Sequence, residues 1–274
     1  MLYLLLAVFG SATISIIMRL SSQRVSARLS MLAANYLMCL TLGAAFSGFR
    51  VAPDTASTCL MGLFNGILYL SSFILLQYTT RKAGVVLSSV FMKLGLLVPF
   101  ILSVTLFKEA PTWLHICGFI LAVAAIVLMH LEKGATQKVP LASLLALLIL
   151  GGSANAMSKV FNTWGNTAFS EQFLFYTFTS AFLLCLILVL TKREKPKAAD
   201  LLFGLLIGIP NFFSSRFLLA SLGSLPAVVA YPTFSAGTIL LVTLAGILFF
   251  KERLSKTQWL AMGGIFIALI LLNI

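Results

Sequence analysis

The feature that most constrains this fold is a succession of long apolar runs with very little polar sequence between them. A helix that crosses a bilayer needs about 20 consecutive, mainly apolar residues. The sequence predicts ten such spans, at 2–20, 31–49, 57–78, 84–107, 112–131, 141–161, 170–190, 199–221, 226–250 and 257–273. The longest linkers are short charged loops, so no soluble domain fits between the spans. We therefore expect an all-α membrane protein.

The composition and the placement of charge agree with this class. Of the 274 residues, 60% are hydrophobic and only 9% are charged, which excludes a water-soluble domain and argues against nucleic acid as a partner. Of the 19 basic residues, 13 follow odd-numbered spans, and only Arg50 and Lys108 follow even-numbered ones. Because Lys and Arg are enriched in cytoplasmic loops, this bias places the odd loops in the cytoplasm and both termini outside.

A duplication organises the chain. Leu-Phe-Lys-Glu at 106–109 returns as Phe-Phe-Lys-Glu at 249–252, and each copy precedes a polar turn with Trp113 or Trp259 and one further apolar run. Earlier matches, at an offset of 142 residues, include Gly62 with Gly204 and Gly66 with Gly208. The sequence therefore predicts two five-helix repeats, 1–134 and 135–274, in one membrane domain. An odd number of crossings inverts the second repeat, which is typical of secondary transporters.

The same residues carry a family resemblance. Two five-helix halves, each closed by Phe-Lys-Glu and a downstream Trp and Gly, resemble the EamA family of the drug/metabolite transporter superfamily. The resemblance covers the whole chain and implies a central cavity, peripheral fifth and tenth helices, and transport of small metabolites or drugs. It also implies cytoplasmic termini, which the charge bias contradicts, so the orientation stays open.

Lys93 is the first candidate for substrate binding, because it lies near the middle of the predicted span 84–107. A charge at that depth is costly and normally faces a cavity or a partner. All seven acidic residues fall in loops or at span ends, so we expect Lys93 to lack an acidic partner and to bind an anionic group of the substrate. The alternative is a structural lysine that snorkels or binds backbone carbonyls.

Other polar residues of the spans are weaker candidates. Ser89 lies one turn before Lys93 on the same helical face. Its repeat counterpart is Pro232, which follows Tyr231 and removes a helical hydrogen bond, so Pro232 is a candidate hinge. Further predicted substrate contacts are Tyr231, Tyr69, Asn155 and Asn211. For each of these the alternative is an interhelical hydrogen bond or simple packing, and we expect the neighbouring glycines to be helix contacts.

Two other features have a structural interpretation. Arg19, Lys159 and Arg216 lie near span ends, where snorkelling to headgroups is the expected behaviour. The two Phe-Lys-Glu turns are expected to be helix caps and headgroup anchors.

The sequence lacks the usual signatures of an enzyme or a metal site. It contains no HExxH motif, no phosphate-binding glycine loop and no Cys/His cluster, so we expect no catalytic activity, no metal and no cofactor. The span 2–20 contains no acid of the kind that small multidrug exporters use for proton exchange, which argues against cationic drugs.

These observations predict a multi-pass transporter of the inner or plasma membrane. Its partners are the bilayer and a small polar substrate, anionic or zwitterionic such as an amino acid, which it exports or exchanges by alternating access. Two alternatives remain: an exporter of apolar or cationic drug-like compounds on the same fold, and a non-transporting or lipid-handling membrane subunit. The sequence does not decide between a monomer and a homodimer.

Overall fold

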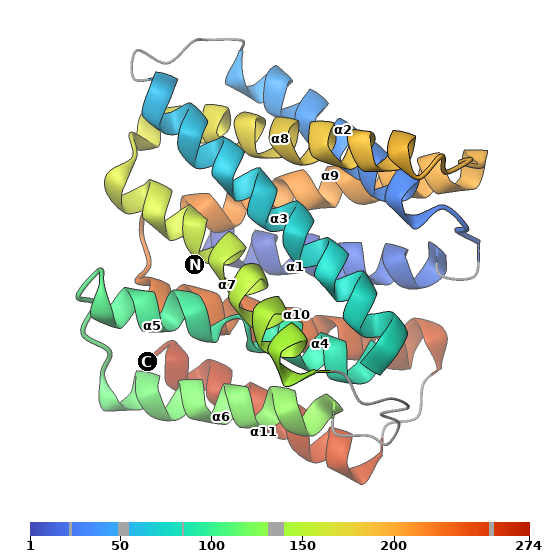
Figure 1. Cartoon of the computed structure of the whole chain (residues 1–274). Helices are drawn as coiled ribbons and strands as arrows, with labels where there is room; N and C mark the ends of the chain where they lie inside the picture. Colours follow the sequence, from blue (N-terminus) through green and yellow to red (C-terminus); the bar gives the residue numbers. More distant parts are fainter. Residues whose placement is uncertain (22–23, 49–54, 84, 131–139, 252–254) are drawn as a thin grey trace. The chain divides into compact units, whose positions relative to one another are not determined.

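The apolar runs of the sequence fold into α-helices (Figure 1). The computed structural model describes residues 1–21, 24–48, 55–83, 85–130, 140–251 and 255–274. Its helices are α1 (Leu2–Ser21), α2 (Arg28–Ser47), α3 (Thr55–Ala83), α4 (Val85–Leu94), α5 (Leu97–Thr105), α6 (Trp113–His130), α7 (Leu141–Trp164), the 3-10 turn η1 (Thr167–Phe169), α8 (Ser170–Thr191), α9 (Ala198–Ser221), α10 (Ala227–Phe250) and α11 (Lys256–Leu272). Among the described residues, each predicted span is helical with ends that differ by a few residues, except that the span 84–107 is divided between α4 and α5.

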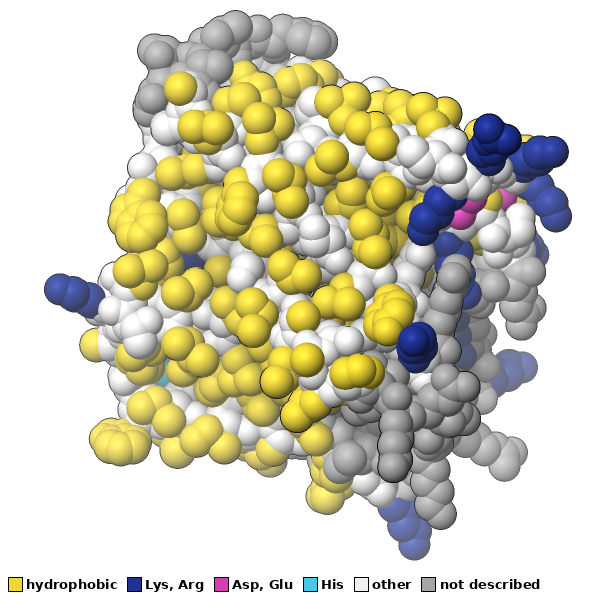
Figure 2. All heavy atoms as spheres, viewed as in Figure 1, with side chains coloured by type: hydrophobic (Ala, Val, Ile, Leu, Met, Phe, Trp, Pro, Cys, Tyr) yellow, Lys and Arg dark blue, Asp and Glu magenta, His cyan; other side chains and the backbone are white. Residues whose placement is uncertain are grey.

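The prediction of ten spans is only partly met. Among the described residues, seven helices are long and apolar enough to cross a membrane, and three further apolar helices are shorter, Phe91–Thr105, Trp113–Leu128 and Lys256–Leu272. Many large apolar side chains are exposed, for example Leu248 at 72% and Leu260 at 71%. Figure 2 shows hydrophobic side chains over the face in view, with Lys and Arg gathered at its margin. The surface therefore matches contact with lipid.

The chain divides into two compact units, and each takes helices from both halves of the sequence. The first unit comprises Met1–Leu70 and Val160–Gly223, and the second comprises Ser71–Lys159 and Ser224–Ile274. In the first unit α9 packs against α1 and α2, and α8 packs against α2. In the second unit α6 packs against α11 and α4, and α10 contacts α5, α6 and α11.

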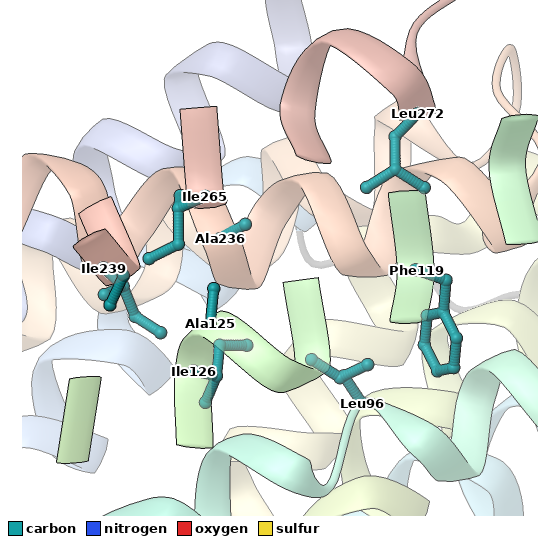
Figure 3. Packing of buried hydrophobic residues seen from close by; sticks show 9 residues of the cluster. Leu96, Phe119, Ala125, Ile126, Ala236, Ile239, Ile265 and Leu272 are labelled. Carbon is teal, nitrogen blue, oxygen red and sulfur yellow. The ribbon is translucent and has the colours of Figure 1, made fainter. Parts of the chain in front are cut away.

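The second unit has a core of apolar side chains that come from both repeats (Figure 3). Its members include Leu96, Phe119, Ala125, Ile126, Ala236, Ile239, Ile265 and Leu272. The rings of Phe100 and Phe119 stack beside it with centroids 3.7 Å apart. Because lipid tails are as apolar as these side chains, close packing rather than removal from water stabilises such a core.

Glycines set the helix contacts of the first unit, as the sequence predicted. A Cβ added at Gly62 would lie 2.6 Å from Cβ of Tyr176 on α8, and one at Gly204 would lie 2.6 Å from Cβ of Ala34 on α2. The offset of 142 residues relates both members of the two contacts, Gly62 to Gly204 and Ala34 to Tyr176. The duplicated sequence thus forms the same close contact twice.

These contacts make substitution of one glycine costly. Gly204→Ala would bring its Cβ into collision with the backbone carbonyl oxygen of Met31, so α2 and α9 must separate. We expect a loss of about 1–3 kcal/mol in the free energy of unfolding, measured by thermal or denaturant unfolding in detergent. Gly263→Ala on α11 is the matched control, because a Cβ there meets nothing within 4 Å. Equal stability of the two variants would contradict this packing.

Candidate functional site

Lys93 lies at the end of α4, with a half-buried side chain and no ion pair to any described residue. The described acids have other contacts. Glu109 pairs with Lys159 and Glu171 with Arg216, whereas Glu194 and Asp200 accept hydrogen bonds near the start of α2. Over this part of the chain Lys93 has no acidic partner, as the sequence predicted, and its role in binding an anionic group stays a prediction.

The helix breaks immediately after Lys93, which the sequence analysis did not anticipate. The predicted span 84–107 consists of α4 and α5, separated by a turn at Gly95 and Leu96. The backbone N–H of Leu96 donates to the Lys93 carbonyl at 3.3 Å, a three-residue spacing in place of the helical four. Pro99 explains the break, because it has no N–H for the Gly95 carbonyl and its ring crowds that carbonyl. The sequence did contain a signal for this helix break, namely Gly95 together with Pro99.

The broken helix lies close against α7. A Cβ added at Gly152 would collide with the backbone oxygen of Gly95, so no side chain fits between these backbones. Gly151 contacts Met92 in the same region. This contact holds the turn after Lys93 in place, and discontinuous helices of this kind provide substrate sites in transporters.

Tyr231 and Asn155, two further predicted site residues, meet in the second unit. Tyr231 is 2% exposed, and its hydroxyl donates to the backbone carbonyl oxygen of Asn155 at 2.8 Å. The bond links α10 to α7 one residue before Pro232. Helix α10 continues through Pro232, so the hinge role of Pro232 stays a prediction.

The remaining predicted residues are divided between the units. Ser89 belongs to α4 in the second unit, but its side chain lies outside the described part. Its neighbour Ser88 has a buried hydroxyl without a hydrogen-bond partner among the described residues. In the first unit, Asn211 donates to Oδ1 of Asn35 at 3.2 Å, which is the interhelical bond given as its alternative role. Tyr69 packs edge-on against Phe178.

An unpredicted contact anchors the start of α10. The Glu109 carboxylate accepts the backbone N–H groups of Ala227 and Val228, each at 3.0 Å, and Nζ of Lys159 on α7 lies 2.7 Å from its Oε1. Glu109 of the first Phe-Lys-Glu turn therefore does cap a helix, but this helix is the distant α10, which the sequence did not predict. Lys108 and Lys251, equivalent residues of the two turns, share a left-handed backbone, with φ of 54° and 52°. Glu252 lies outside the described residues.

Lys159 and Arg216 each form an ion pair that the expectation of snorkelling did not include. Lys159 pairs with Glu109, and Nε of Arg216 donates to Oε1 of Glu171 at 2.6 Å. The acids lie 50 and 45 residues away in the chain, so sequence position did not reveal the pairing.

The chain matches the sequence profile of the EamA-like transporter family over residues 1–131 and again over 138–274. It belongs to the EamA-like transporter family. An uncharacterised protein of Haemophilus influenzae is 25% identical over 274 residues, which is 94% of this chain and 92% of the relative. One solved crystal structure matches with a TM-score of 0.80 at 15% identity, over 98% of this chain and 94% of the other, and supports the fold alone. This EamA-like chain is a multi-pass membrane protein with a two-repeat architecture.

The Glu109–Lys159 contact generates a stability prediction for this EamA-like protein. The two side chains are only 14% and 13% exposed, so removing one charge leaves the other buried without a partner. We expect Glu109→Gln to lower the free energy of unfolding by about 1–3 kcal/mol. The double variant Glu109→Gln/Lys159→Met should lose less than the sum of the single variants. Additive losses in denaturant unfolding would show that the pair is not coupled. Lys197→Met, at an exposed lysine, is the control.

Proposed function

We propose that this protein is a secondary transporter that exports or exchanges a small anionic or zwitterionic metabolite, such as an amino acid, by alternating access. The family assignment supports transport. The substrate class rests on one observation, the half-buried Lys93 beside a helix break and without an ion pair among the described residues. An unpaired ammonium within the membrane is stabilised when an anionic substrate group binds it.

The roles of the other residues in this proposal follow their positions. Lys93 binds the negative group, and Ser89, one turn earlier, orients it. Tyr231 lines the site from α10, where its bond to the Asn155 carbonyl fixes α10 against α7. Pro232 supplies flexibility in α10 because the Val228 carbonyl has no N–H from residue 232. Tyr69 and Asn211 are proposed substrate contacts in the first unit.

Ligand-dependent unfolding tests the substrate class. A ligand that binds only the folded protein raises the melting temperature. At a concentration 100 times its Kd, it raises the free energy of unfolding by about 2.7 kcal/mol. We expect amino acids or organic acids to stabilise the parent protein in detergent, and Lys93→Ala to reduce the affinity at least about tenfold, since a charged hydrogen bond contributes about 1.5–3 kcal/mol. Lys192→Ala, at an exposed loop lysine, should respond like the parent.

Other outcomes would change the proposal. Stabilisation by quaternary amines or apolar drugs alone, with Lys93→Ala unaffected, would favour the drug-exporter alternative. A protein that is stabilised by no soluble compound, and that moves none of them in proteoliposomes, would favour a non-transporting membrane subunit.

The orientation is tested separately. The basic loop before α9 is predicted to face the cytoplasm and the neutral turn before α8 to face outward. With the four native cysteines replaced by serine, Lys195→Cys should react with an impermeant thiol reagent only in broken cells, whereas Asn166→Cys should react in intact cells. Both positions are exposed. The reverse labelling pattern would support the cytoplasmic termini that the family resemblance implies.

A further inference from the structure

A small pocket lies within the first unit, and none of the residues that line it is assigned above to substrate binding. Its walls come from α1, α8 and α9 and include Tyr3, Glu171, Leu174, Arg216 and Phe217. Its volume is about 160 Å³. Glu171 belongs to the first turn of α8, and Arg216 to the final turns of α9, so the pocket lies at an end of these helices.

An ion pair forms the polar wall of this pocket. Nε of Arg216 donates to Oε1 of Glu171 at 2.6 Å, and the two side chains are 32% and 24% exposed. The guanidinium carbon lies 4.5 Å from the centroid of the Phe46 ring, which fixes the guanidinium by a cation–π contact. Both charges are thus present, and held in place, beside an open space.

The pair is incompletely satisfied. Oε2 of Glu171 is buried and accepts no hydrogen bond from any described residue. A buried carboxylate oxygen without a donor is costly, and a carboxylate can accept about four hydrogen bonds. Arg216 carries five N–H donors, of which the described residues bind only the one at Nε. The described residues therefore leave hydrogen-bonding capacity on the Glu171 carboxylate and on the other N–H groups of Arg216.

The other walls restrict what can supply these groups. The rings of Tyr3 and Phe217 stack with centroids 6.2 Å apart, and Leu174 adds an apolar side chain. A purely anionic ligand would bind Arg216 but be repelled by Glu171. A purely cationic ligand would bind Glu171 but be repelled by Arg216. A zwitterion complements both charges, because its ammonium donates to a carboxylate and its carboxylate accepts from a guanidinium. The small volume admits only a short side chain.

We infer that this pocket is an access site that binds small zwitterionic amino acids, with the ammonium on Glu171 and the carboxylate on Arg216. The inference rests on the proposed function in that it takes the same substrate class. It places a second binding site at the helix ends, where a substrate is held before or after it crosses the membrane. Glu171 and Arg216 would then set the preference for zwitterions over simple anions, while Lys93 binds the carboxylate in the other unit.

Cysteine protection tests the pocket directly. Ser170 lines it, and the native cysteines are replaced by serine. In this background glycine and alanine should slow thiol labelling of Ser170→Cys, whereas acetate and methylamine, each carrying half of the zwitterion, should not. Tryptophan should be ineffective because of its size. Ser255→Cys, at the N-terminal cap of α11, is the control position. Equal protection by acetate, or no protection by glycine, would overturn the inference.

Binding measurements with variants separate this site from the Lys93 site. Glu171→Gln should weaken glycine binding to the pocket about tenfold or more, and Glu194→Gln is the matched control, an acid of the same unit whose Oε2 binds Ser30 instead. In a Lys93→Ala background, residual glycine binding should disappear with Glu171→Gln and persist with Glu194→Gln. If glycine binding depends on Lys93 alone, the pocket is not a site and the proposed function stands. If it depends on Glu171 alone, the Lys93 site is wrong and the pocket stands.

Discussion

The structure depends on how polar groups are satisfied where no water is present. Each helix satisfies its own interior backbone, but its first N–H groups need acceptors from elsewhere. In the described residues, carboxylates supply them: Glu109 accepts from the start of α10, Glu194 from Ser30 in the first turn of α2, and Asp200 from Ser26 just before it. Three acids of a chain with only seven thus connect segments that are distant in the sequence.

This use of the acids explains the electrostatics of the chain. The loop cations Lys192, Arg193 and Lys195 are exposed, whereas Glu194 is half-buried and Asp200 fully buried. Because the acids are turned inward to cap helices, the outward charge of these loops is strongly positive. Because the described acids are bound to helix starts or to other cations, none of them pairs with Lys93. The proposed anion site at Lys93 therefore depends on the same contacts that cap the helices.

The duplication appears in the structure as repeated contacts rather than as separate halves. Gly62 with α8 and Gly204 with α2 are the same contact formed twice, and Lys108 and Lys251 share one backbone conformation. Nevertheless, each compact unit combines segments of both repeats, and α3 and α7 each contribute residues to both units. The boundary predicted after residue 134 separates the two repeats along the sequence. That each repeat is also a structural unit stays a prediction.

The sequence by itself determined the class, the helices, the duplication and the glycine contacts, because apolar run length and small-residue spacing are local properties. It also identified Lys93 as a cation without an acid at its depth. Only the tertiary structure decided that Lys159 pairs with Glu109 and Arg216 with Glu171, and that Asn211 bonds Asn35. Local signals, Gly95 and Pro99, were present for the helix break, but continuous hydropathy concealed it. Pair partners lie 45 to 176 residues apart, and only packing brings them within bonding distance.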